Sequence, residues 1–152
     1  MSEQVYSYFD YNGETDLPEE GVADFRGVPH YFWLRKDLDA RRGLFDIVPI
    51  DDALLRRVVE FQSIFHAWDV DYHAGRVALE THPMRPGMND RFVTLHREIC
   101  DAALALREKA FSQTGVFSLA PSWVKHSRQF EGRRWPVPGL YSFILEVTWV
   151  TA

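Results

Sequence analysis

The sequence predicts an α+β fold, in which a largely antiparallel sheet of about five strands carries two amphipathic helices (about 52–74 and 90–112) on one face. Two observations predict the helices: apolar residues recur at spacings of three and four, and a capping residue precedes each run. A third observation predicts the sheet. Short segments rich in aromatic and β-branched residues are expected to be strands, and because most of them follow one another without a helix in between, the sheet should be largely antiparallel. The length of 152 residues indicates a single domain, 1–152.

Aromatic and β-branched residues mark the expected strands. The last strand has the strongest signal, because apolar residues alternate from Tyr141 to Trp149, and the apolar residues on both of its faces suit a central place in the sheet. Residues 14–24 are acidic and contain Pro18 and Gly21, which indicates a surface loop. The expected strands are 4–11, 28–36, 43–50, 115–120 and 140–150.

The two helices have clear expected ends. The first begins at Asp51 or Asp52, whose carboxylate can accept the unpaired amides of the first turn, and it closes at Gly75. The second begins at Asn89 or Asp90 and runs to about residue 112. We expect both helices to share one core with the last strand, made of Phe61, Phe65, Trp68, Leu95, Ile99, Leu106, Phe143, Leu145 and Val147.

Composition narrows the classes of function. The net charge of -5 argues against nonspecific binding to nucleic acid or to anionic membranes. The long irregular segment 121–139 mixes basic residues with aromatics, but one such segment on an acidic chain does not indicate a nucleic-acid-binding protein. Cys100 is the only cysteine, so neither an internal disulfide nor a cysteine-based zinc site can form. The first residues do not have the features of a secretory signal, and no window is apolar enough to span a bilayer, so we expect a cytoplasmic location.

The stretch HAWDVDYHAG, residues 66–75, raises the question of a metal site. On a helix, His66, Asp69 and His73 share one side, and a metal could be held by such a trio. The two histidines, however, lie about two turns apart, roughly 10 Å along the axis, which is long for ligands of one ion. A polar flank of the helix is the favoured interpretation, with His73 interacting with the helix dipole.

A second metal alternative joins His73 to two histidines further along the chain. If the helices pack side by side, His73, His82 and His96 converge near the connecting loop. Otherwise His82 orders its turn through a backbone hydrogen bond, and His96 is partly buried on the second helix. The sequence favours this second interpretation.

Two short segments carry a resemblance. GVADFRGVPHYF (21–32) and HPMRP (82–86) together resemble a group of small bacterial proteins that share a G-V-A-x-F-x-G-x-P-H segment and a later H-P-x-x-P. The resemblance implies a stand-alone bacterial domain. It implies no activity and identifies no functional residues.

The expected function is binding. The chain has no nucleophile motif, no catalytic setting around Cys100 and no phosphate-binding glycine loop. We therefore expect a small protein-binding domain without a cofactor, of which an immunity or antitoxin protein inhibiting a basic partner is one instance. The alternative is a small metal-dependent hydrolase or ligand-binding enzyme built on the histidines. The expected partner-binding residues are Glu14, Asp16, Glu19, Glu20, Tyr11, Tyr31 and Trp33.

Overall fold

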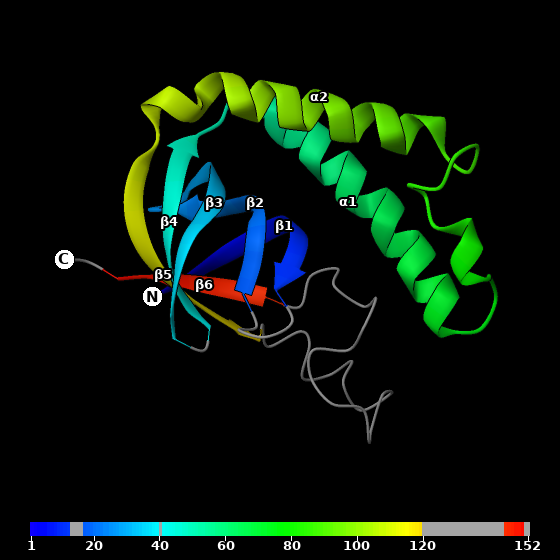
Figure 1. The fold of residues 1–152 in the computed structure, drawn as a ribbon, viewed down its shortest axis with the longest axis horizontal. Coiled ribbons are helices and arrows are strands. Elements are labelled where there is room, and N and C mark those ends of the chain that lie inside the picture. Colours follow the sequence, from blue (N-terminus) through cyan, green and yellow to red (C-terminus); the bar gives the residue numbers. More distant parts are fainter. Residues whose placement is uncertain (13–16, 40, 120–144, 151–152) are drawn as a thin grey trace.

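The computed structural model describes residues 1–12, 17–39, 41–119 and 145–150, with side chains for all of these except 9–12 and 119. Within these residues, six strands follow one another around a closed barrel, and two helices are inserted between the fourth and the fifth strand (Figure 1). The helices α1 and α2 lie across the outside of the barrel. The elements are β1 (Ser2–Asn12), β2 (Leu17–Phe25), β3 (Val28–Asp39), β4 (Arg42–Pro49), α1 (Asp52–His73), η1 (Leu79–Thr81), α2 (Asp90–Leu106), η2 (Arg107–Lys109), β5 (Phe111–Leu119) and β6 (Leu145–Trp149).

The expected open sheet of five strands with both helices on one face is wrong. Every neighbouring pair of strands is antiparallel, and β1 also pairs with β6, for instance Ser2 with Thr148, so the sheet closes on itself. Closure removes the two outer edges that an open sheet would leave unpaired. The strand that the sequence prediction missed is β2.

The loop predicted at 14–24 is mostly strand β2. Its acidic residues and Gly21 suggest a loop, yet Val22 and Ala23 are fully buried on opposite faces of the barrel wall. Gly21 is needed because β1 passes very close: a Cβ atom there would lie 2.2 Å from the Ser7 carbonyl oxygen. The glycine that looks like a loop signal is therefore a close-packing residue within a strand.

Two separate cores replace the single core expected from the sequence. One fills the barrel and contains the side chains of Leu145 and Val147, whereas the other lies between the barrel and the helices. The strand alternation explains the division: Tyr31 and Trp33 of β3 face the helices, and Phe32 between them points into the barrel. The expected contact between the last strand and the helices is therefore wrong; Phe143 lies outside the described residues.

The helix starts are confirmed, and one helix end is corrected. The Asp51 side chain accepts the Leu54 amide hydrogen at 2.8 Å, and the Asn89 side chain accepts that of Phe92 at 2.9 Å. Gly75, with φ +76°, follows the last turn of α1 as expected. However, α2 ends at Leu106, and β5 already begins at Phe111, which pairs with Ile47 of β4.

The segment after α1 contains a turn of 3₁₀ helix, Leu79–Thr81. Of the predicted strand 140–150, Leu145–Trp149 is a strand and 140–144 lies outside the described residues, as does the segment 121–139. None of the described helices is both long enough and apolar enough to cross a membrane.

Candidate functional site

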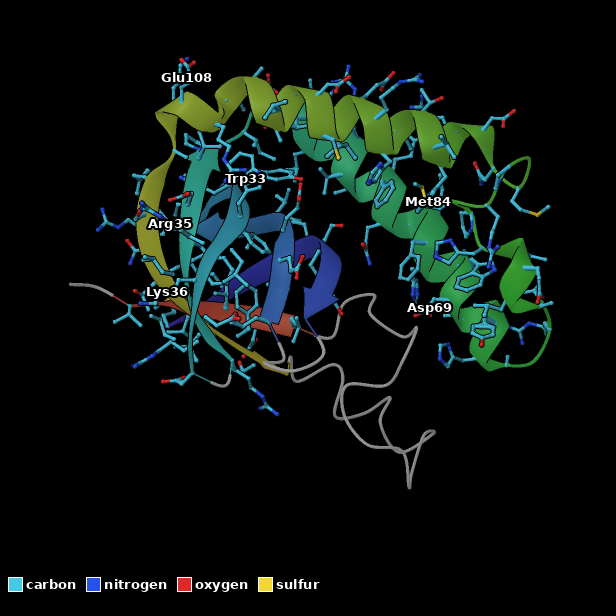
Figure 2. All side chains as sticks on the ribbon, viewed as in Figure 1. Trp33, Arg35, Lys36, Asp69, Met84 and Glu108 are labelled. Carbon is cyan, nitrogen blue, oxygen red and sulfur yellow. The ribbon has the colours of Figure 1, made fainter. Side chains whose placement is uncertain are left out.

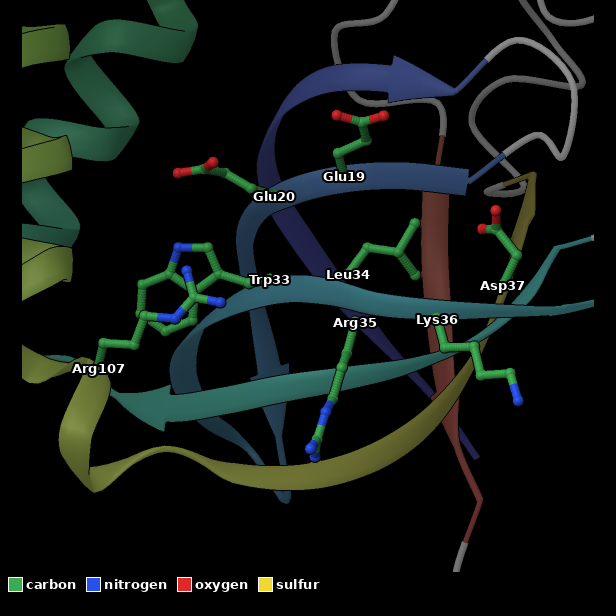
Figure 3. A pocket seen from close by; sticks show the side chains of 8 residues that line it. All are labelled: Glu19, Glu20, Trp33, Leu34, Arg35, Lys36, Asp37 and Arg107. Carbon is green, nitrogen blue, oxygen red and sulfur yellow. The ribbon is translucent and has the colours of Figure 1, made fainter.

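The barrel wall opens between β2 and β3. The pairing of these strands runs from Phe25–Val28 to Glu20–Trp33 and ends there, although both strands continue. A hollow of about 390 Å³ lies where they part (Figure 3). Its lining residues come from three elements: Glu19 and Glu20 from β2, Trp33, Leu34, Arg35, Lys36 and Asp37 from β3, and Arg107 from η2.

Two bulges in β3 accompany the opening. Leu34 pairs with Phe45 and Lys36 with the preceding residue of β4, Leu44, so Arg35 is an extra residue in the ladder. A second irregularity follows between Asp37 and Asp39. Bulges bend a strand and increase its twist. They therefore allow β3 to follow β4 while β2 stays paired with β1.

A stacked pair forms one end of the hollow. The Arg107 guanidinium carbon lies 4.7 Å from the centre of the Trp33 ring, which places the cation over the aromatic face. The Trp33 ring in turn lies 4.7 Å from the Tyr31 ring, and only 7% of Trp33 is exposed. This end of the hollow is consequently held by packing against the helix-facing core.

The charges around the hollow are mixed. Three carboxylates, those of Glu19, Glu20 and Asp37, share the lining with three cationic side chains. Tyr31 donates a hydrogen bond to the Glu20 carboxylate, which fixes that group in place. Arg35 donates to the Ser112 hydroxyl at 3.0 Å and lies 3.8 Å from the Asp46 carboxylate. Such a lining suits a ligand that presents polar groups of both signs.

The inner side of the hollow is apolar. Leu34 is half-buried and packs against the barrel core, and Figure 3 shows its side chain directed toward the space between β3 and β2. Gly43 of β4 sits behind it: a Cβ atom there would lie 2.8 Å from Leu34 Cδ1 and 3.2 Å from Leu17 Cδ1. An inserted group would therefore meet leucine side chains on the inside and charged groups at the rim.

The structure brings part of the predicted partner-binding set together. Glu19, Glu20 and Trp33 line the hollow, and Tyr31 is fully buried behind it, so Tyr31 has no surface to offer a partner. Glu14, Asp16 and the side chain of Tyr11 lie outside the described residues.

Sequence reasoning missed the cationic half of the lining: Arg35, Lys36 and Arg107. Arg107 falls within the predicted second helix and Lys36 ends a predicted strand, so neither position indicates a site. The bulges that set the direction of β3 have no signal in the sequence. Only the neighbouring charges of the segment RKD, 35–37, could have indicated a polar rim.

The first histidine trio does not form a metal site. The His73 Nδ1 atom lies 2.9 Å from the Asp69 carbonyl oxygen and 3.3 Å from its carboxylate, which places the imidazole at the C-terminal turn of α1 as the dipole interpretation expects. Asp69 is fully buried, unlike a residue on a solvated flank. Among the residues that the structure describes, no group of three or more His, Cys, Asp or Glu side chains is placed to hold a metal ion.

The second trio is also dispersed. The Met84 amide donates to His82 Nδ1 at 3.1 Å, so His82 orders its turn as expected, and its ring lies 4.6 Å from that of Trp68. His96 is half-buried on α2, with Nε2 3.8 Å from Cys100 Sγ. Burial lowers the pKa of His82, and the nearby Arg85 charge lowers it further. These histidines serve local packing. Figure 2 shows Asp69 and Met84 on the projecting part of the helical hairpin, away from Trp33.

A third cluster of polar side chains lies at one end of the barrel, around Asp24. The Tyr6 hydroxyl donates to the Asp24 carboxylate at 3.0 Å, and burial together with this bond raises the pKa of Tyr6 to about 12. His30 Nδ1 donates to the Val28 carbonyl at 2.7 Å, while burial lowers its pKa. The Trp149 indole donates to the Asp24 carbonyl at 2.7 Å. The cluster ties β1, β2 and β6 together and is structural.

Comparison with known proteins adds no family to this description. The chain matches no protein-family model, and no curated protein or solved structure matches it significantly. The geometry of the hollow is the observation that bears on function.

Proposed function

We propose that the chain is a protein-binding domain that captures a segment of another protein in the hollow between β2 and β3. An immunity or antitoxin protein, which inhibits a basic partner by covering it, is the instance that fits best. The observation that supports this proposal is the gathering of Glu19, Glu20 and Trp33 at an opening of the barrel wall. Aromatic and arginine side chains such as Trp33 and Arg107 often dominate the energy of protein interfaces.

The lining favours binding over catalysis by a nucleophile. Among the residues that the structure describes, the eight side chains of the lining include no serine, cysteine or histidine, the groups that most often act as nucleophile and base. Nothing in the placement of the histidines favours the hydrolase alternative. We therefore propose recognition as the function.

Charge supports a basic partner. The whole chain has a net charge of -5, and Glu19 and Glu20 offer contacts to basic groups at a rim that also carries Arg35, Lys36 and Arg107. An excess of negative charge steers a basic protein toward the surface and raises its association rate, an effect that salt screens over about 8–10 Å. The cytoplasm is the compartment that we propose for this activity, since a sequence with one cysteine, Cys100, forms no internal disulfide and suits a reducing environment.

A selection experiment tests the proposal. The full chain is immobilised and presented with a displayed library of random peptides at low salt, and the affinities of the recovered peptides are measured by calorimetry. We expect basic peptides, and we expect the double variant Glu19→Gln/Glu20→Gln to bind them about fivefold to tenfold more weakly, because two attractive charges are lost.

The matched control removes two exposed carboxylates far from the hollow. Glu80→Gln/Asp90→Asn changes the net charge by the same amount at the projecting end of the helical hairpin. This double variant should bind the selected peptides with an affinity within about twofold of that of the native chain, since screened charges at that distance contribute little. Equal losses in both double variants would assign the effect to net charge, and a selection without any binder would contradict the proposal itself.

A further inference from the structure

Arg107 places an unpaired cation at one end of the hollow. Its guanidinium lies over the Trp33 ring, and among the residues that the structure describes it has no ion-pair or hydrogen-bond partner. The carboxylates of Glu19 and Glu20 line the same hollow, yet neither of them forms an ion pair with it. A guanidinium carries five N–H donors. The donors of Arg107 are therefore available to a ligand.

The Trp33 ring fixes the position of this cation. The guanidinium carbon lies 4.7 Å from the ring centre, where the electron-rich face attracts it, and the ring supplies no oxygen to accept its N–H groups. Trp33 is buried and packs against the Tyr31 ring, so it offers Arg107 a firm support. A side chain that is already held in place loses less conformational freedom when a ligand binds. The stacked pair is thus a preorganised receptor for an anion.

We propose that Arg107 binds the C-terminal carboxylate of the partner, so that the captured segment is the end of the partner chain. This inference rests on the proposed function and specifies which part of the partner enters the hollow. A carboxylate matches a guanidinium in shape, because two parallel N–H···O bonds can join them. Capture of a chain terminus is a recurring mode of peptide recognition.

The shape of the hollow favours a chain end over the middle of a chain. From the Glu20–Trp33 pair to the Phe25–Val28 pair, β2 and β3 form continuous barrel wall. A segment that enters where the two strands part therefore reaches closed wall at Trp33, and Figure 3 shows Arg107 at the same end. The volume of about 390 Å³ is near the lower limit for ligand pockets, roughly 300–1,000 Å³. A chain that stops at Arg107 has no need to continue past the wall.

The carboxylates of β2 favour a basic residue next to the chain end. The Glu20 carboxylate is held by the Tyr31 hydroxyl, whereas Glu19 is exposed and has no ion-pair partner among the described residues. A lysine or arginine within the last few residues of the partner can contact these carboxylates while the terminus stays at Arg107. The mixed charges of the lining therefore suit the end of a basic chain, which carries charges of both signs.

A double-mutant cycle between ligand and protein tests the assignment. The library selection is repeated with random peptides whose C-termini are free, and the tightest-binding peptide is remade with a C-terminal amide. Calorimetry gives the affinities of both peptides for the native chain and for Arg107→Gln. We expect amidation to weaken binding to the native chain about tenfold, because charge-assisted hydrogen bonds are lost. In Arg107→Gln, amidation should weaken binding by less than about twofold.

Two further variants separate the geometry of Arg107 from its charge. Lys36→Gln removes one positive charge at the other end of the same lining, and the effect of amidation should stay at about tenfold (Figure 3). Arg107→Lys keeps the charge but cannot form two parallel bonds, so it should bind the free acid at least about threefold more weakly than the native chain does. Both side chains are exposed, so all three variants should melt within about 2 °C of the native chain.

The possible failures are distinguishable. If peptides bind but amidation weakens binding equally in the native chain and in Arg107→Gln, Arg107 does not bind the terminus, and this inference is overturned while the protein-binding proposal stands. An acidic side chain within the peptide that is coupled to Arg107 in place of the terminus would overturn it as well. If neither selection recovers a peptide, the proposed function fails together with the inference.

Discussion

The inside of the barrel and the layer between the barrel and the helices are packed in different ways, although the same strands supply both. Inside, the rings of Phe32, Phe45 and Phe117 lie 5.3 to 5.5 Å apart in tilted or edge-on arrangements. In the helix layer, eight of the twelve buried residues are aliphatic, and Phe61 stacks on Phe92 at 4.1 Å. The barrel interior therefore holds a connected group of tilted and edge-on rings, whereas the rings of the helix layer form pairs among a majority of aliphatic side chains.

The two cores are coupled through β3. Phe32 faces the barrel interior, while its neighbours Tyr31 and Trp33 face the helices. A slip of β3 by one residue would exchange the side chains that β3 contributes to the two cores. Packing on both faces of the strand therefore fixes its register. We therefore expect the barrel and the helical hairpin to unfold as one cooperative unit.

The largest expected effect comes from emptying the barrel. Phe32→Ala removes a fully buried ring from contact with two others and should lower the free energy of unfolding by about 3–5 kcal/mol. Urea unfolding followed by near-ultraviolet circular dichroism measures the loss, and Phe32→Leu should recover part of it. If helix content and aromatic signals were lost at different urea concentrations, the coupling of the two cores would be disproved.

A substitution in the helix layer should have a similar or somewhat smaller effect. Leu95→Ala deletes a fully buried side chain of α2 and should cost about 2–5 kcal/mol, depending on how far the layer collapses. Leu104 provides a matched control, because it is a leucine of the same helix with 66% of its surface exposed. Leu104→Ala should change stability by less than about 0.5 kcal/mol. Equal losses in the two variants would mean that α2 does not pack on the barrel through Leu95.

Acid should produce the smallest effect, and it should arise from both regions. Burial lowers the pKa of His30 at the barrel end and that of His82 at the helical hairpin. The folded state therefore binds fewer protons than the unfolded state, in which the pKa is about 6.5. The contribution of these two histidines to the free energy of unfolding is fully present above a pH of about 6.5. It is lost as the pH falls toward the lowered pKa values of the folded state.

Two single variants separate the contributions of the histidines. An asparagine amide can donate to the Val28 carbonyl in His30→Asn, and an asparagine oxygen can accept from the Met84 amide in His82→Asn. Each should flatten the decline of melting temperature between neutral and mildly acidic pH. Should both variants decline as steeply as the native chain, these histidines do not set the acid response.

Local signals predicted much of the secondary structure. Asp51 and Asn89 begin the helices as expected because a cap acts within one turn of chain. The sequence predicts apolar burial on both faces of the last strand, but in β6 the residues between the buried ones are half-buried. Burial on both faces occurs instead in β2, β3 and β4, for instance at Ile47 and Val48. The predicted number of strands is too small because β2 is not recognised as a strand. Gly21 of β2 permits a close contact with β1, which no local sequence pattern reveals.

The candidate site was less predictable than the fold. Glu19, Glu20 and Trp33 were selected for their charge or aromatic character, and they do line one hollow. Arg107 reaches the hollow only because α2 ends at the preceding residue, Leu106, and η2 follows. Arg35 lines it because a bulge makes it an extra residue in the β3–β4 ladder. Both depend on how distant segments meet, which neither spacing nor composition specifies.

The pairing of β1 with β6 has a consequence for how the protein is made. Ser2 lies opposite Thr148, so β1 needs a partner strand that is synthesised after the other described strands. The buried residues of the helix layer, by contrast, come from β2 through α2 and are complete well before β6 is translated. Nascent chains therefore carry an unpaired β1 edge until β6 is translated, and unpaired strand edges are sites of aggregation. Folding in the cell should be most vulnerable in the interval between completion of the helical hairpin and arrival of β6.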